Sequence, residues 1–403
     1  MNVLIVHQNF PGQFPHIADA LIARGDRLAA IGGPMARARP GVDLRRWSYG
    51  RGSTEGIFNA ATRAEADLIR AEAAALQASR LRADGFTPDV IIGHPGWGET
   101  IHLKEVWPSA KVILFGELYY RARGGDTNFD PEFAQPSLAE TMRVNAKNAT
   151  QALAYVSADV IVSPTKWQAG TFPPALRTNQ RVLHEGVDLS RARRRAGATV
   201  TTPGGRVLDG SRPVVTFVNR TLEPLRGFHI FMRALPAFLE AAPDAEVLVI
   251  GQEARSGYGL QAPDGQTWKA FMLAELGDRL DRSRVHFMGT VPYARLIDAF
   301  SISWAHVYYT YPFALSWSLI EAMACECLVI ASDTPPPHDA ITNGKEGLFV
   351  PFFDVPALSS TLLRAVGEQD AFAEMRQVAR ERALAFDRRH GVRGWLDLID
   401  RYA

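Results

Sequence analysis

Two arginines, a glutamate and two loop residues, a glycine and a histidine, are the best candidates in this chain for chemistry. Arg220 and Arg226 lie in the segment VNRTLEPLRGFH, where a predicted strand ends and a predicted helix begins. Two guanidinium groups at such a turn would grip a pair of phosphates, because their planar forks match phosphate oxygens. Isolated arginines in surface loops are more often simply solvated. Their position at the carboxyl edge of a strand favours the binding interpretation.

Glu321 stands inside FALSWSLIEAMA, residues 313–324, where almost every other residue is small or apolar. One explanation is a capping box, since Ser318-x-x-Glu321 has the right spacing. The helix is expected to begin nearer Ser316, however, which puts Glu321 past the first turn. A desolvated carboxylate needs a partner, and the paired hydroxyls of a ribose would supply one. The free N–H groups of residues 315–318 would then face an anion.

Gly12 and His94 follow two predicted strands near the amino terminus, in HQNFPGQFP and DVIIGHPGWGET. A glycine after a strand either lets the backbone approach a ligand or only makes the turn. A histidine among glycines is a candidate for a site, although a lone histidine is more often structural. The sequence contains no GxGxxG and no GxxxxGK[ST] pattern, which argues against a dinucleotide or P-loop site.

Composition limits the class of protein. The chain has 403 residues, 47% of them hydrophobic, which is too long for one core and enough for two domains. Its formal charge of +1, from 44 basic and 43 acidic residues, predicts no nucleic-acid partner. Cys325 and Cys327 have neither disulfide nor zinc spacing, and we expect a reducing cytoplasm. The sequence shows no signal peptide and no spanning helix, so any membrane contact would be peripheral, at the inner face.

Short apolar strands alternate with longer amphipathic helices along the whole chain, which predicts parallel sheets covered by helices on both faces. The predicted strands are 3–6, 27–31, 90–92, 111–115, 160–162, 213–218, 246–250, 285–287, 306–309, 328–331 and 348–350. Helices are expected over 15–23, 62–82 and 138–155, and from Phe228, Trp268, Ala294, Ser316, Val355 and Phe372. A basic and then Thr/Gly/Pro-rich stretch marks a boundary after Leu189. We therefore predict a domain over 1–190, a linker or hairpin over 191–212, and a second domain over 213–386.

The segment SWSLIEAMACECLVIASDTPPPHDAITNGKEGLFVPFFD, residues 316–354, resembles the hallmark region of the family-4 retaining glycosyltransferases of GT-B fold. Further similar stretches are VNRTLEPLRG, VHFMGTV at 285–291, HEGVD at 184–188 and the strand, glycine and helix at the amino terminus. The resemblance spans nearly the whole chain and is dense in the second half. It implies two Rossmann-like, doubly wound domains that face a central cleft, with the C-terminal helix, 387–403, joining the first domain.

The resemblance also assigns roles. The first domain would serve the acceptor and the second the donor, a nucleoside diphosphate sugar. It implies the following site: catalytic His94, Arg220 and Arg226, and donor-binding Gly12, Gly289, Thr290, Val291, Ser316, Trp317, Ser318 and Glu321. His94 would touch the transferred sugar, the arginines the diphosphate, residues 289–291 the base and Glu321 the ribose. Neither a metal nor a cofactor is expected, and the oligomeric state is left open.

The expected function is transfer of a hexose, with retained configuration, to a glycan, lipid-linked or other acceptor in glycan biosynthesis. Two alternatives stay open: a nucleotide-sugar epimerase of the same fold, and a non-catalytic sugar-nucleotide-binding subunit. The family often carries two glutamates in the hallmark region, and the position of the first falls on Phe313 here. Either backbone groups at 314–317 read the sugar instead, or donor preference differs, or activity is weak.

Overall fold

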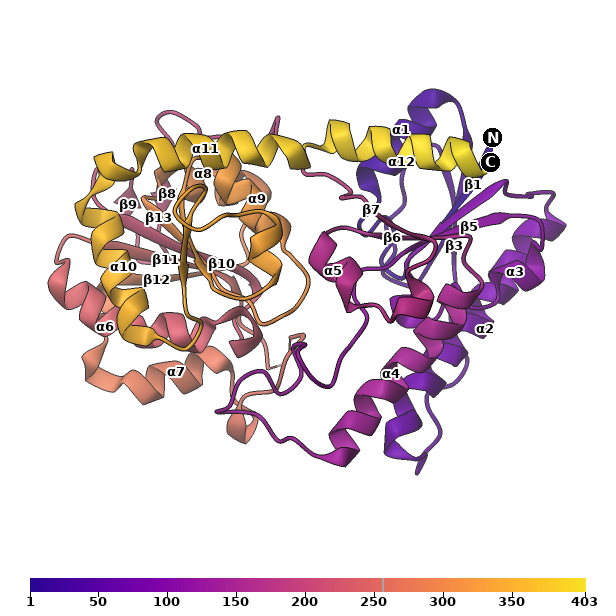
Figure 1. Cartoon of the computed structure of the whole chain (residues 1–403), viewed down its shortest axis with the longest axis horizontal. Helices are drawn as coiled ribbons and strands as arrows, with labels where there is room; N and C mark the ends of the chain where they lie inside the picture. Colours follow the sequence, from indigo (N-terminus) through magenta and orange to yellow (C-terminus); the bar gives the residue numbers. More distant parts are fainter. Residues whose placement is uncertain (256) are drawn as a thin grey trace. The chain divides into compact units, whose positions relative to one another are not determined.

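A computed structural model describes residues 1–255 and 257–403, and the chain divides into two compact units. The first unit contains residues 1–186 together with 388–403, and the second contains 187–387. Each unit is built around its own parallel sheet (Figure 1). Among the described residues, no helix has both the length and the apolar character needed to cross a bilayer.

The first unit has a seven-stranded parallel sheet in the order β3-β2-β1-β4-β5-β6-β7. The strands are β1 (Asn2–Val6), β2 (Arg27–Gly32), β3 (Val42–Arg46), β4 (Val90–Gly93), β5 (Lys111–Phe115), β6 (Val160–Ser163) and β7 (Gln180–Val182). The helices are α1 (Pro15–Arg24), α2 (Thr62–Ala83), α3 (Leu103–Val106), α4 (Leu138–Val156), α5 (Lys166–Thr171) and α12 (Arg388–Tyr402). The strand order reverses between β1 and β4, which makes this the switch point of the sheet.

Helices bury both faces of this sheet, and the period of two along β1 shows how. Leu4 and Val6 belong to the core under α2 and α4, whereas Val3 and Ile5 belong to the core under α1 and α12. A strand covered on both sides has no polar face, and therefore reads as a continuous apolar run. Helix α12, at the far end of the chain, packs back on this unit: a Cβ at Gly391 would lie 2.5 Å from the Glu185 carbonyl oxygen.

The second unit repeats the plan with a six-stranded parallel sheet in the order β12-β11-β10-β13-β14-β15. The strands are β10 (Val214–Thr221), β11 (Glu246–Gln252), β12 (Val285–Gly289), β13 (Ala305–Tyr308), β14 (Leu328–Ser332) and β15 (Leu348–Val350). The helices are α6 (Phe228–Ala241), α7 (Trp268–Leu276), α8 (Tyr293–Ile302), α9 (Trp317–Ala324), α10 (Val355–Gly367) and α11 (Ala373–Ala383). Its switch point lies between β10 and β13.

The expected α/β architecture of two doubly wound halves is confirmed. Every predicted strand and every predicted helix is present, with bounds that differ by a few residues. Two edge strands, β3 and β7, were not predicted. The segment 191–212 contains β8 (Val200–Thr201) and β9 (Val207–Leu208), which form a small antiparallel pair within the second unit.

Candidate functional site

The two strands that flank the switch point of the first unit are each followed by a histidine. His7 follows β1 and His94 follows β4, and their rings meet edge to face with centroids 5.4 Å apart. In open α/β sheets, ligands bind at the carboxyl ends of the strands where the strand order reverses. The topology therefore places predicted His94 at the position of this sheet where a ligand is expected.

His94 is held rigidly. It begins a single 3-10 turn, Pro95–Trp97, and its Nδ1 accepts a hydrogen bond from the Gly96 N–H at 3.0 Å. Its ring stacks on Trp97 at 4.6 Å, and only 6% of the side chain is exposed. Because Nδ1 accepts, the proton of the neutral ring lies on Nε2. That nitrogen is 3.4 Å from the carboxylate of Glu117, which lies two residues past the end of β5.

Gly12 has a close neighbour within the chain. Its φ is +53°, and a Cβ there would lie 2.2 Å from Nε2 of His7. The absence of a side chain at Gly12 thus leaves room for the His7 ring. This need for glycine exists whether or not the loop also binds a ligand. His7 is buried, and burial together with the adjacent His94 lowers its pKa to about 3, so that the ring is neutral at physiological pH.

In the second unit, Arg226 bridges the two strands of the switch point. It ends a 3-10 turn, Pro224–Arg226, after β10, and its Nη1 donates to Thr310 Oγ1 at 2.9 Å and to the Ala314 carbonyl at 3.1 Å. Thr310 follows β13, and Ala314 leads into α9. The guanidinium is partly exposed and stands where an anion would meet the carboxyl ends of both strands.

Arg220 is exposed near the end of β10, and its Nη1 donates to the Tyr258 hydroxyl at 2.7 Å. The loop that carries Tyr258 is fixed by Glu223, whose carboxylate accepts from the Tyr258 and Gly259 N–H groups at 3.1 and 2.7 Å. Glu223 is 1% exposed. Glu223, which lies between the two predicted arginines in the sequence, therefore fixes Tyr258 next to Arg220.

Phe313 stands between the two arginines. Its ring lies 5.6 Å from the ring of Tyr258, and the Arg226 guanidinium carbon lies 5.4 Å from its centroid. Contacts therefore run from Arg220 through Tyr258 and Phe313 to Arg226. The structure brings the arginines into one cluster through two aromatic rings, and an apolar side chain occupies the position where the resemblance led us to expect a glutamate.

The helix that carries Glu321 begins as the sequence suggested. Ser316 is its N-cap and accepts from the Ser318 N–H, so Glu321 lies in the second turn and the capping-box explanation is excluded. Two backbone donors near this end of the helix already have partners. The Ser318 N–H donates to the Ser316 hydroxyl, and the Ser316 N–H donates to the Tyr308 hydroxyl at 2.9 Å. Trp317 is partly exposed.

Glu321 is 6% exposed, and burial raises its pKa. The Tyr293 hydroxyl and the charge of Arg191 partly offset this rise. Tyr293 opens α8, two residues past the end of the predicted base-binding segment 289–291. The Arg191 guanidinium lies 4.5 Å from the centroid of its ring. Thr290 is exposed, and Val291 packs with Tyr293 against the core. The structure thus brings Glu321 beside the residues expected to meet the base.

Several polar residues of these clusters were missed by the sequence reasoning: His7, Gln13, Glu117, Glu223, Tyr258 and Tyr293. A usable signal existed for His7 and Glu117, because each comes within two residues of the end of a predicted strand. For Tyr258 and Tyr293 the signal is tertiary contact alone.

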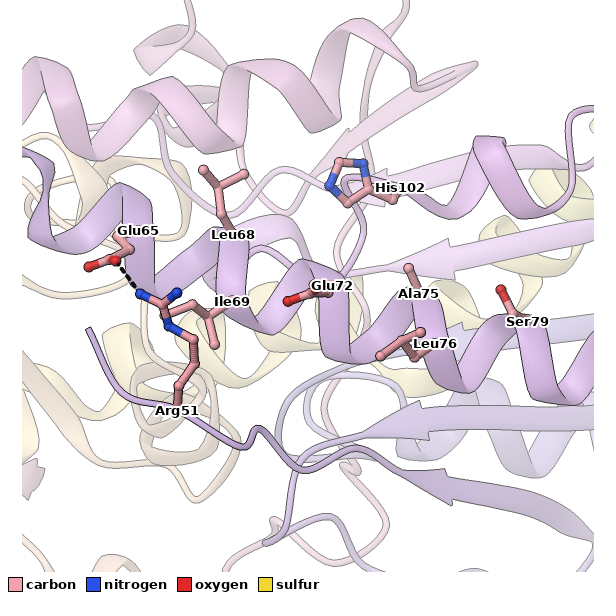
Figure 2. A pocket seen from close by; sticks show the side chains of 9 residues that line it. All are labelled: Arg51, Glu65, Leu68, Ile69, Glu72, Ala75, Leu76, Ser79 and His102. Atoms are coloured by element: carbon pink, nitrogen blue, oxygen red, sulfur yellow. Dashed lines mark hydrogen bonds and ion pairs between the residues drawn. The ribbon is translucent and has the colours of Figure 1, made fainter. Parts of the chain in front are cut away.

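A surface pocket of the first unit lies elsewhere. It follows one side of α2, with Arg51 and His102 from neighbouring segments, and includes an ion pair between Arg51 and Glu65 at 2.9 Å (Figure 2). Its other lining residues are Leu68, Ile69, Glu72, Ala75, Leu76 and Ser79. None of the predicted site residues lines this pocket.

Comparison with known proteins adds two family matches that together cover most of the chain. Residues 24–192 match the model described as "Glycosyl transferase family 4 group", and residues 204–384 match "Glycosyl transferases group 1". Among curated proteins, the D-inositol 3-phosphate glycosyltransferase of Rhodococcus jostii is 30% identical over 231 residues, 55% of this chain and 49% of that protein. Its counterpart in Nocardia farcinica is 29% identical over 217 residues, 54% and 46%. The chain spans about half the length of these curated relatives.

Solved structures with the same fold cover the chain completely. Sucrose-phosphate synthase of Thermosynechococcus elongatus superposes with a TM-score of 0.75 at 15% identity, covering 100% of this chain and 98% of that one. Anabaena HepE in complex with UDP-glucose superposes with a TM-score of 0.66 at 15% identity, covering 100% of both. At such identities the likeness concerns the fold.

Proposed function

Because this chain belongs to the family-4 glycosyltransferases of GT-B fold, we propose that it transfers a hexose from a nucleoside diphosphate sugar to a hydroxyl group of an acceptor. The observation that carries the proposal is the cluster at the switch point of the second unit. There, Arg226 is anchored to Thr310 and Ala314, and Arg220 is linked to it through Tyr258 and Phe313. This arrangement offers two guanidinium groups to a diphosphate.

In the proposed complex, Glu321 accepts hydrogen bonds from the ribose hydroxyls, and the base lies against residues 289–291. Burial makes a lone carboxylate costly in this place, and a ligand that donates two hydrogen bonds would offset that cost. Tyr293 holds the carboxylate in the free protein and would share it with the ribose or yield to it. HepE, a protein of this fold, was solved with UDP-glucose bound, which supports a donor of this class.

We propose that the reaction proceeds with retention of configuration. The acceptor oxygen forms a bond to the anomeric carbon on the face from which the phosphate departs, the bond from that carbon to the phosphate oxygen breaks, and the acceptor proton passes to the departing phosphate. Negative charge grows on the diphosphate during this step. Fixed guanidinium groups stabilise such charge without reorganising, which is the main electrostatic contribution expected here. His94 would contact the transferred sugar, and we assign no step to a metal.

The acceptor is proposed to be a polyhydroxylated molecule. The curated relatives are named for D-inositol 3-phosphate, so a phosphorylated polyol is the first acceptor to test. Glycan and lipid-linked acceptors form the rest of the panel.

The test is a panel of UDP-, GDP- and ADP-hexoses, with and without acceptors, followed by NMR of the sugar product. Arg226→Ala, Arg220→Ala and Glu321→Ala should each weaken binding of the productive donor by about tenfold or more, as expected when a charged hydrogen-bond partner is lost. Arg212→Ala, a mostly exposed arginine of the same unit, serves as the matched control.

Three results would contradict the proposal. Unchanged donor binding in the Arg226 and Glu321 variants would refute the site. Isomerised donor without transfer would identify an epimerase. Donor-induced thermal stabilisation without turnover over the whole acceptor panel would identify a binding subunit. Addition of a chelator tests the metal-free mechanism, which predicts unchanged turnover.

A further inference from the structure

Glu117 has a carboxylate that lies beside His94. His94 was predicted as a site residue, whereas Glu117 was not. It lies two residues past the end of β5, next to the loops that follow β1 and β4, so residues after three neighbouring strands converge on it. Its side chain is 37% exposed, whereas His94 is almost fully buried. Unlike the two buried histidines beside it, Glu117 can therefore be reached by solvent or a ligand.

Two N–H groups lie close to this carboxylate, and one of them donates a hydrogen bond to it. His7 Nδ1 accepts from the Asn9 N–H at 2.9 Å, so its Nε2 carries the proton and donates to Gln13 Oε1 at 2.6 Å. The Gln13 amide nitrogen then donates to Glu117 Oε1 at 3.3 Å. His94 Nε2 lies 3.4 Å from Glu117 Oε2, close to it but without a formed hydrogen bond. One carboxylate oxygen thus accepts a single hydrogen bond and the other accepts none from its neighbour, while a carboxylate can accept about four.

The backbone of Glu117 is fixed as well. The side-chain amide of Gln168, itself buried, donates to the Glu117 carbonyl at 2.7 Å. Burial raises the pKa of Glu117, but the neighbouring His94, His7 and Gln13 side chains outweigh this effect, and the pKa lies below its usual value. The carboxylate is thus ionised, and hydrogen bonds fix both the side chain and the backbone of Glu117. This order lowers the conformational entropy that is lost when a ligand binds. The remaining lone pairs are available to a ligand that donates.

An aromatic surface accompanies the carboxylate. Trp97 stacks on His94 and meets the His7 ring edge to face at 5.2 Å, and its own side chain is partly exposed. An apolar ring beside a small number of fixed polar groups is the usual composition of a small-molecule site. A ligand with several hydroxyl groups and a face of C–H bonds satisfies both features at once. A cation would satisfy the carboxylate but would meet two N–H donors beside it.

We propose that Glu117 is a binding residue for a hydroxyl group of a polyhydroxylated ligand, with Gln13 and His7 as the residues that position it. The ligand class rests on the geometry of the first unit alone. Its identification as the acceptor of the transfer rests on the proposed function. The proposal involves binding only and requires no proton transfer.

The experiment uses the full chain and saturation-transfer NMR with myo-inositol, D-inositol 3-phosphate and methyl α-glucoside, together with deoxy analogues that each lack one hydroxyl. At least one intact probe should bind, and Glu117→Gln should weaken that binding by about tenfold, the usual loss for a charged acceptor. The analogue that lacks the recognised hydroxyl should bind the unmodified chain and Glu117→Gln equally well. Gln13→Ala should give a smaller loss in the same direction.

Glu105→Gln, an exposed carboxylate in α3, is the matched control and should leave probe binding unchanged. UDP affinity and melting temperature of Glu117→Gln should equal those of the unmodified chain, which separates a lost ligand contact from misfolding. The proposal is overturned if no polyol probe binds, or if Glu117→Gln binds every probe as the unmodified chain does. Failure of the proposed function would appear differently: the unmodified chain would turn over none of the donors, while the polyol measurements would still give the expected results.

Discussion

The guanidinium of Arg226 lies over the ring of Phe313, 5.4 Å from its centroid, and the same ring contacts Tyr258, which holds Arg220. An aromatic ring attracts a cation through its face but does not neutralise it. Both arginines therefore keep their full charge for an anion. A carboxylate in place of Phe313 would form an ion pair with Arg226 and compete with a bound diphosphate.

Phe313→Glu is therefore expected to weaken UDP binding by about tenfold, since a competing ion pair of about 1.4 kcal/mol suffices for that factor. Isothermal titration with UDP measures the change. Phe313→Leu keeps the site apolar and should bind UDP within about threefold of the unmodified chain. Equal UDP affinity for the Glu and Leu variants would show that Phe313 does not set the charge of the diphosphate site.

Tyr293→Phe tests the assignment of Glu321 to the ribose. Burial raises the pKa of Glu321, and the Tyr293 hydroxyl opposes this rise by donating to the ionised form. Removal of the hydroxyl should raise the pKa further. If the ribose binds the carboxylate, UDP affinity falls as the pH drops through this pKa, and the fall should begin at a higher pH in Tyr293→Phe.

Titrations with UDP between about pH 5 and pH 8 measure this shift. Ionisation of UDP itself is common to both proteins and cancels in the comparison. Tyr49→Phe, an exposed tyrosine, is the control. Superimposable pH profiles for Tyr293→Phe and the unmodified chain would rule out an ionised Glu321 as the ribose ligand.

We expect buried Glu99 to make the protein less stable as the pH rises. It is 0% exposed, neither carboxylate oxygen has a hydrogen-bond partner in the described part of the chain, and burial raises its pKa from 4.5 to about 7. Between these values the folded state binds more protons than the unfolded state, so the free energy of unfolding falls as the pH rises. The raised pKa corresponds to on the order of 3 kcal/mol.

Glu99→Gln should remove this dependence, because a neutral amide does not titrate. Relative to the unmodified chain, the variant should gain stability from pH 5 to pH 8, by up to about 3 kcal/mol. Denaturant unfolding at both pH values gives the difference, in which all other titrating groups cancel. A difference that does not change with pH would show that Glu99 is ionised in the folded protein over this range.

The sequence predicted the strands that are buried on both faces but missed two edge strands of the first sheet, β3 and β7, for a physical reason. Strands such as β1 and β14 are covered on both faces and read as apolar runs, whereas β3, VDLRR, and β7, QRV, lie at an edge with partly exposed side chains. Edge strands need no apolar run, since only neighbouring backbone groups define them. Their pairing depends on the sheet already being present.

The candidate site shows the same limit. Arg220, Glu321 and His94 could be selected because each lies at the end of a predicted strand or interrupts an apolar run. Their partners Tyr258, Tyr293 and Glu117 lie far from them in sequence, and only tertiary folding brings them into contact. The roles assigned to the predicted residues stay predictions until donor binding is measured.

Gly12→Ala tests whether the first loop depends on its contact with His7. Gly12 and Gly25 both have positive φ, +53° and +89°, but a Cβ at Gly25 meets nothing within 4 Å, whereas at Gly12 it would overlap the His7 ring. Gly25→Ala should therefore cost only the backbone strain, about 1 kcal/mol. Gly12→Ala should cost roughly 1–3 kcal/mol more, because overpacking displaces a buried ring. Displacement of His7 also moves Gln13 from Glu117, so polyol binding should weaken. Denaturant unfolding of both variants and NMR with myo-inositol measure the two effects, and equal stability of the two variants would show that the His7 ring adapts without consequence.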